Sequence, residues 1–136
     1  MQLRHEPMGP QFDKWHIEGM PRSAVLHRFT AADTGPAHDH PWPFHSFVLS
    51  GGYVEEVFDR ETGSSQLINR TPGESFYIEA EHIHRIVHLP AGECWTIILP
   101  YEWEQKSGFW EFRPDGAYHR FWDQPDFTKI PDGAQP

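Results

Sequence analysis

The chain has 136 residues with 11 lysines and arginines against 20 aspartates and glutamates, which gives a formal net charge of −9. This length suits one domain with a core of its own, and the acidic balance argues against nucleic acid or an anionic membrane as a partner. A single cysteine, Cys94, excludes an internal disulfide and a cysteine-based zinc site, and since no apolar run is long enough for a signal peptide or a membrane span, we expect a cytoplasmic protein.

Short β-rich runs recur along the chain and are separated by turn residues. Thirteen prolines and eleven glycines interrupt the sequence, and no long segment repeats its apolar residues with the period of a helix. The predicted strands, in chain order, are 12–18, 24–29, 45–50, 53–58, 65–70, 75–79, 84–89, 94–99, 109–113 and 118–122. Because parallel strands need helical crossovers, this pattern predicts an all-β sandwich or barrel of antiparallel strands, in one domain spanning residues 1–136.

Three histidines stand close together in the stretch AHDHPWPFHS, residues 37–46. Alternate residues of an extended strand point to the same face, so His38 and His40 can offer two ring nitrogens to one first-row metal ion. His45 is the nearest candidate for a further ligand, because it lies on the more apolar face of its predicted strand and we expect that face to point inward. Two prolines lie between His40 and His45, so strand alternation cannot be carried from one to the other. The alternative for His38 and His40 is a solvated loop, and the alternative for His45 is an imidazole that supports a ligand or contacts the substrate.

A second group of histidines lies in the stretch EHIHRIVH, residues 81–88. By strand alternation, His82, His84 and His88 share one face and apolar side chains occupy the other. An apolar interior would turn these histidines outward. They can point inward only if the interior contains a polar or metal-lined pocket at this place, and His82 and His88 are expected to line that pocket or lie at the surface.

The first histidine stretch resembles the first motif of the cupin superfamily. That motif has the order His-x-His, three or four residues, Glu, six residues and Gly. Here His38-x-His40 is followed by four residues, His45, six residues and Gly52.

The second stretch is similar to the second cupin motif, in which a Pro-x-Gly turn precedes a histidine. Pro72 and Gly73 would form this turn and His84 would be the ligand, so that the resemblance covers about residues 35–90. It implies a double-stranded β-helix, the cupin jelly roll, in which two antiparallel sheets form a small barrel. It also implies a mononuclear divalent metal ion held by His38, His40 and His84.

One departure from the cupin pattern changes the expected chemistry, because His45 stands where the motif has its glutamate. If His45 binds, four imidazoles leave the metal charge uncompensated, which favours an anionic substrate or hydroxide. If it does not, a three-histidine face keeps open positions, an arrangement found in the superfamily in thiol and diketone dioxygenases that use ferrous iron. We therefore expect Fe(II), with Ni, Mn or Zn as alternatives.

The resemblance implies a metal and a pocket but no particular reaction. The leading hypothesis is a non-haem Fe(II) dioxygenase acting on a small organic substrate, with Tyr53 or an outer histidine as the candidate for handling protons. An isomerase or hydrolase that uses the metal as a Lewis acid, and a non-enzymatic cupin that binds a small ligand or a metal, stay open. The candidates for lining the substrate pocket are Trp42, Tyr77, His88 and Trp95. Ordinary packing is an equal alternative for Trp42 and the favoured one for Tyr77 and Trp95, whereas His88 could instead lie at the surface. The aromatic-rich segment 101–127 suggests a final hairpin or a subunit interface, and the family makes a homodimer an expectation.

Overall fold

Two antiparallel β-sheets make up the fold. The computed structural model describes residues 1–19 and 22–136. Within these residues the regular secondary structure consists of strands, without a helix. In order, the first sheet contains β1 (Gln2–Pro7), β2 (Phe12–Glu18), β3 (Ala24–Phe29), β10 (Cys94–Pro100), β5 (Phe44–Ser50) and β8 (Ser75–Ile78). The second contains β13 (Thr128–Lys129), β12 (Gly116–Phe121), β11 (Gly108–Arg113), β4 (Ala37–His38), β9 (Ile83–His88), β6 (Tyr53–Phe58) and β7 (Ser65–Arg70). The expected all-β jelly roll is confirmed.

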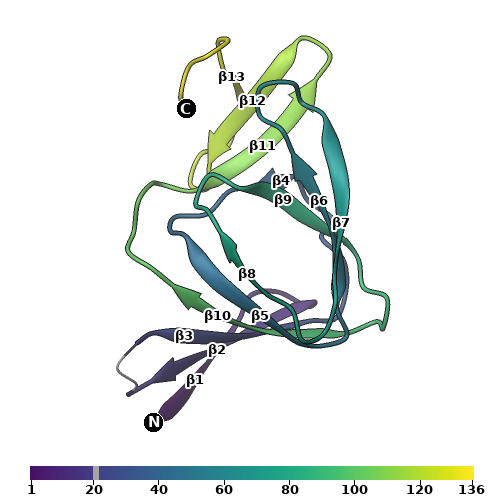
Figure 1. Ribbon diagram of the computed structural model, residues 1–136. Coiled ribbons are helices and arrows are strands. Elements are labelled where there is room, and N and C mark those ends of the chain that lie inside the picture. Colours follow the sequence, from purple (N-terminus) through teal and green to yellow (C-terminus); the bar gives the residue numbers. More distant parts are fainter. Residues whose placement is uncertain (20–21) are drawn as a thin grey trace.

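The two sheets face each other around a shared interior (Figure 1). A buried cluster joins them, with Val48 and Cys94 contributed by the first sheet and Tyr53 and Ile86 by the second. The N-terminal strands β1 to β3 extend at one end of the molecule, and the C-terminus lies at the opposite end beside β13 (Figure 1). The described residues include no helix long and apolar enough to cross a membrane.

All ten strands predicted from the sequence are present, although their ends shift by a residue or two. The structure adds β1, β4 and β13 to them. The β4 strand escapes prediction because it has only two residues, Ala37 and His38, which is too short for an alternating pattern. It nevertheless matters most for the site, because it carries the first histidine of the metal motif.

The turn between β5 and β6 shows why the motif ends in glycine. Gly51 and Gly52 both have positive φ angles, 82° and 75°, which residues with a side chain rarely adopt. A Cβ atom on Gly52 would also come within 2.6 Å of the carbonyl oxygen of Arg70. The two glycines therefore allow the chain to turn tightly from β5 in the first sheet into β6 in the second. The turn places Tyr53 and Glu55 of β6 in the interior.

Candidate metal centre and its cavity

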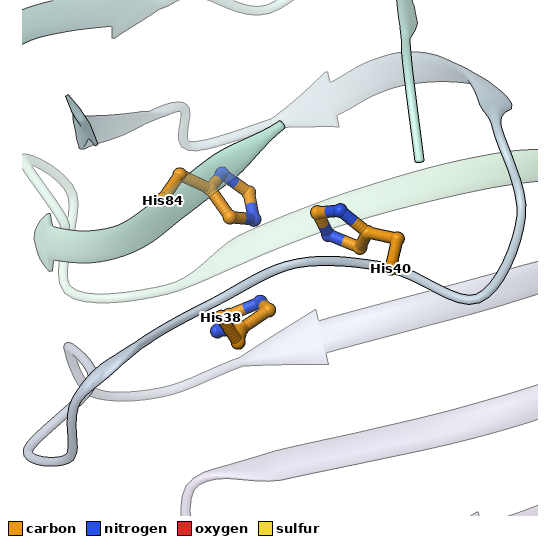
Figure 2. Close-up of side chains that lie close together, drawn as sticks. All are labelled: His38, His40 and His84. Carbon is orange, nitrogen blue, oxygen red and sulfur yellow. The ribbon is translucent and has the colours of Figure 1, made fainter. Parts of the chain in front are cut away.

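Three histidines, from β4, the loop that follows it and β9, point towards one another (Figure 2). His38 ends β4 and is the direct cross-strand partner of His84 on β9, while His40 lies two residues beyond His38. One ring nitrogen from each residue lies within 4.8 Å of the other two. The ring centroids are 4.8 Å apart for His38 and His84, 4.9 Å for His40 and His84, and 5.3 Å for His38 and His40. The structure thus brings together the three histidines that the two motifs single out.

The electrostatics of these histidines suit a divalent metal ion. Burial, with the neighbouring imidazoles, lowers the pKa of His38 to about 3 and holds the pKa of His40 well below its usual range. Both rings are therefore neutral and keep a lone pair for coordination. Among the described residues, Nδ1 of His40 is buried and has no hydrogen-bond partner. An orphaned ring nitrogen is costly in an ordinary core but fits a metal ligand, so the donor set fits a divalent cation.

Glu55 on β6 is a site residue that the sequence reasoning missed. Its carboxylate is fully buried and accepts hydrogen bonds from His82 Nε2 at 2.8 Å, His84 Nδ1 at 3.0 Å and Arg70 Nε at 2.9 Å. Although burial acts to raise it, these hydrogen bonds hold the pKa of Glu55 well below its usual range. The run YVEEVF contains a usable signal, because strand alternation puts Glu55 on the same face as Tyr53 and so predicts one inward-facing carboxylate.

The contacts of Glu55 also decide between two overlapping candidate groups. Glu55, His82 and His84 form a second set whose ligating atoms lie within 4.8 Å of one another. The Arg70 guanidinium already occupies this carboxylate and would repel a cation there. The hydrogen bond from His84 Nδ1 to Glu55 instead fixes the ring so that Nε2 points away from Glu55 and is free to coordinate. Metal-bound histidines usually have such a carboxylate on their second ring nitrogen. The three-histidine set is therefore the better cation site.

His45 does not join the three-histidine group. Along β5 the buried residues are Phe44, Ser46 and Val48, so His45 lies on the opposite face, with its ring 5.3 Å from that of Phe47. The expectation that the more apolar face of 45–50 points inward is wrong. The strand begins one residue earlier, at Phe44, and the inner face accepts Ser46 because the interior here contains a cavity.

Phe44 takes the place that the cupin glutamate would occupy. It follows His40 after three residues, which the motif also allows, and its ring centroid lies 5.0 Å from that of His40. A phenyl ring cannot bind the metal. The position next to the three imidazoles is consequently apolar, and any further ligand must come from the cavity.

A cavity of about 400 Å³ adjoins the three histidines. Of the residues predicted to line a pocket or handle protons, Trp42 and Tyr53 face this cavity. The other three lie outside its wall: Tyr77 is 51% exposed, His88 is exposed, and Trp95 stacks on Trp15 with centroids 5.4 Å apart. Burial raises the pKa of Tyr53 far above its usual value, so the phenol stays protonated and can donate a hydrogen bond.

No protein-family profile matches the sequence, and no curated protein matches it. Solved structures are similar in fold. For the hydroxypropylphosphonic acid epoxidase from S. wedmorenis, the TM-score is 0.58 and the identity 13%, over 74% of this chain and 56% of the epoxidase. For the capsular polysaccharide assembling protein CapF from Staphylococcus aureus, the TM-score is 0.60 and the identity 16%, over 96% of this chain and 33% of CapF.

A targeted domain of a Vibrio parahaemolyticus protein of unknown function also matches, with a TM-score of 0.55 and 12% identity over 73% of this chain and 98% of the domain. This chain therefore spans about half the length of the epoxidase and a third of CapF. At such low identities the likeness shows the fold alone. That fold is the cupin fold, as the two histidine motifs suggest.

Proposed function

We propose that the protein is a mononuclear cupin metalloenzyme whose Fe(II) centre carries out oxygen-dependent chemistry on a small organic substrate. One observation carries the proposal: three imidazoles converge within 4.8 Å beside a cavity of about 400 Å³, with Phe44 in place of a fourth ligand. Bound iron would supply redox chemistry with O₂ at positions that face the cavity. A solved structure of similar fold, the hydroxypropylphosphonic acid epoxidase, contains Fe(II), which supports the proposal.

The side chains around the site have separable roles in this proposal. His38, His40 and His84 hold the metal, and Glu55 fixes the orientation of His84. Phe44 keeps water and competing ligands away from one side of the site. Tyr53, which stays protonated, offers a hydrogen bond to a substrate oxygen and does not act as a base at neutral pH.

A metal-dependent hydrolase or isomerase is the second candidate function. The observation that favours it is the ligand set itself, because three histidines beside a cavity also suit a zinc ion acting as a Lewis acid. Turnover that continues without oxygen would favour this candidate over the oxygenase.

Metal analysis tests the ligand set. The protein is purified without a nickel column, and its metal content is measured for the wild type, His84→Ala and His45→Ala. We expect about one metal ion per chain in the wild type and in His45→Ala, and loss of the metal in His84→Ala, because only His84 belongs to the converging group. A wild-type protein without stoichiometric metal, or a His84→Ala variant that retains it, contradicts the proposal.

Binding of nitric oxide tests whether the metal keeps an open position. Anaerobic protein loaded with Fe(II) is expected to give the paramagnetic resonance signal of a high-spin iron–nitrosyl adduct. In Phe44→Glu, a carboxylate replaces the phenyl ring beside His40, so we expect tighter Fe(II) binding and a weaker nitrosyl signal. Wild-type protein that binds Fe(II) but no nitric oxide would have a saturated site and would contradict oxygen-dependent chemistry.

A further inference from the structure

The cavity has a second polar region, away from the metal motifs. Lys14 on β2 and His27 on β3 are direct partners across the two strands, and both side chains line the cavity. These strands belong to the first sheet, whereas His38 and His84 belong to the second. The cavity therefore lies between the three-histidine group on one wall and the Lys14–His27 pair on the other.

Lys14 makes no hydrogen bond or ion pair among the described residues, and its ammonium lies 5.6 Å from the centroid of the Phe12 ring. Burial lowers its pKa, while the nearby charge of Glu6, its neighbour across the strands, acts in the opposite direction. The Glu6 carboxylate itself bonds to His16 Nε2 at 3.2 Å. A half-buried lysine without a direct ion pair beside a cavity is a costly arrangement, which a ligand with a negative charge would relieve.

His27 provides an independent observation in the same place. Its Nε2 is buried and has no hydrogen-bond partner among the described residues. The ring sits edge-on between Phe12 and Phe29, with centroids 5.0 Å and 5.8 Å away. A buried polar atom left unpaired is energetically costly, and a hydrogen bond to a ligand atom would remove that cost.

The charges of the cavity wall point to the same kind of ligand. Within the described residues, the one acidic side chain of the wall is Asp33, and its Oδ2 already accepts a hydrogen bond from the backbone amide of Ile86. Lys14 offsets that charge, and three imidazole ligands, which carry no negative charge, leave the two positive charges of a divalent metal uncompensated. The loaded cavity is thus cationic, and between its polar ends it is walled by Phe12, Phe29, Trp42 and Phe44.

We propose that the substrate of this cavity is a small organic anion whose carboxylate or phosphoryl-type group binds Lys14 and His27 while its apolar body packs against the aromatic wall. This deepens the proposed function, on which it rests for the identity of the opposite end of the cavity. A charge-assisted hydrogen bond from a lysine to such a group is among the stronger polar contacts in proteins. Lys14 and His27 are then binding residues that determine substrate class.

Three probes that share one benzyl body test the proposal: phenylacetate, benzylphosphonate and phenylacetamide. Their dissociation constants are measured by calorimetry on metal-loaded wild type, Lys14→Met, Lys14→Arg and the control Lys106→Met. Lys106 is an exposed lysine that pairs with Asp123 at 2.8 Å. We expect the wild type to bind at least one of the two anions about tenfold or more tightly than the neutral amide.

The preference for an anion is expected to disappear in Lys14→Met and to remain in Lys14→Arg and Lys106→Met. The tighter anion then identifies the carboxylate or the phosphoryl type. Equal binding of the anions and the amide by wild type, or an unchanged preference in Lys14→Met, overturns the proposal. Metal content measured on the same samples distinguishes this inference from the proposed metalloenzyme. Protein that holds metal but shows no Lys14-dependent preference contradicts this inference alone. Protein that holds no metal but shows the Lys14-dependent preference contradicts the metalloenzyme alone.

Discussion

Glu55 links the metal centre to the rest of the second sheet. Its two carboxylate oxygens accept hydrogen bonds from His82, His84 and Arg70, and no part of the side chain reaches solvent. An ionised carboxylate in such a place needs all of these donors, because an unpaired buried charge would cost several kcal/mol. In return it fixes the tautomer and ring angle of His84, which a metal ligand requires.

Replacing Glu55 by glutamine should therefore weaken metal binding without removing a ligand. We expect the affinity of Glu55→Gln to fall roughly 10- to 100-fold, because the amide no longer fixes the His84 ring with a full negative charge. A chelator competition gives the affinity, and the absorption spectrum of the Co(II)-loaded protein should change as the His84 ring reorients.

Glu56→Gln is the matched control, since the neighbouring Glu56 bonds to Arg85 at 2.8 Å and to Ser65 at 2.7 Å, away from the histidines. Equal metal affinities and cobalt spectra for the two variants would show that Glu55 has no role in positioning His84.

Strand β11 holds in place the loop that follows β4 and carries His40. Phe109 and Trp110 pair with His38 and Ala37 of β4. Behind the loop, the buried carboxylate of Asp39 accepts hydrogen bonds from the Gly108 amide at 2.7 Å and from Trp110 Nε1 at 3.0 Å. The C-terminal aromatic segment thus forms a hairpin, β11–β12, that packs against the ligand-bearing loop.

Trp110→Phe should loosen this loop while preserving an aromatic ring in the core. The buried Asp39 would lose one of its donors, so we expect the free energy of unfolding to fall by about 1–3 kcal/mol and the metal affinity to fall with it. Chemical denaturation and chelator competition measure the two effects. Trp103→Phe is the control, because Trp103 is 67% exposed and its replacement should change stability by less than about 0.5 kcal/mol. Equal stabilities of the two variants would contradict the anchoring role of Trp110.

At the scale of the whole molecule, the fold buries several histidines in the neutral form. Two of them lie outside the metal ligands. Burial lowers the pKa of His119 to about 4 and that of His27 to about 3, with the nearby cations Arg60 and Lys14 adding to the respective shifts. His119 packs between Trp110 and Phe121, with ring centroids 4.8 Å from each. Neither imidazole can take up a proton at mildly acid pH unless the surrounding core opens.

Stability should consequently fall as the pH is lowered from about 6.5 towards 4. In this range a histidine of the unfolded chain, with its ordinary pKa of about 6.5, binds a proton that the folded protein excludes. Proton binding therefore stabilises the unfolded state and lowers the free energy of unfolding. His119 alone contributes up to about 1.4 kcal/mol per pH unit in this window. Urea unfolding at several pH values gives the slope, which should be smaller in His119→Gln. An unchanged slope in that variant would show that His119 does not stay neutral in the fold.

Much of the fold could be predicted from the sequence because strands and turns leave local patterns. The ten predicted strands depend on turn residues and β-rich runs, and the convergence of His38, His40 and His84 follows from motif spacing. The orientation of β5 could not be predicted, since two prolines precede it and the inner face includes Ser46 beside a cavity. Glu55 and Lys14 escaped notice because their importance comes from partners, or from the lack of them, on strands distant in sequence.

The shortness of β4 gives the three-histidine group a mechanical consequence. In the second sheet β4 stands between β11 and β9, and its pairing with β9 consists of the single contact between His38 and His84. Strand pairing joins β11, β12 and β13 to the rest of that sheet through this junction between β4 and β9, the seam. A cation bound by His38 and His84 cross-links the seam, so its binding energy adds to folding stability in proportion to the logarithm of the free metal concentration. A metal ion held beside the cavity would therefore also link the two parts of the sheet.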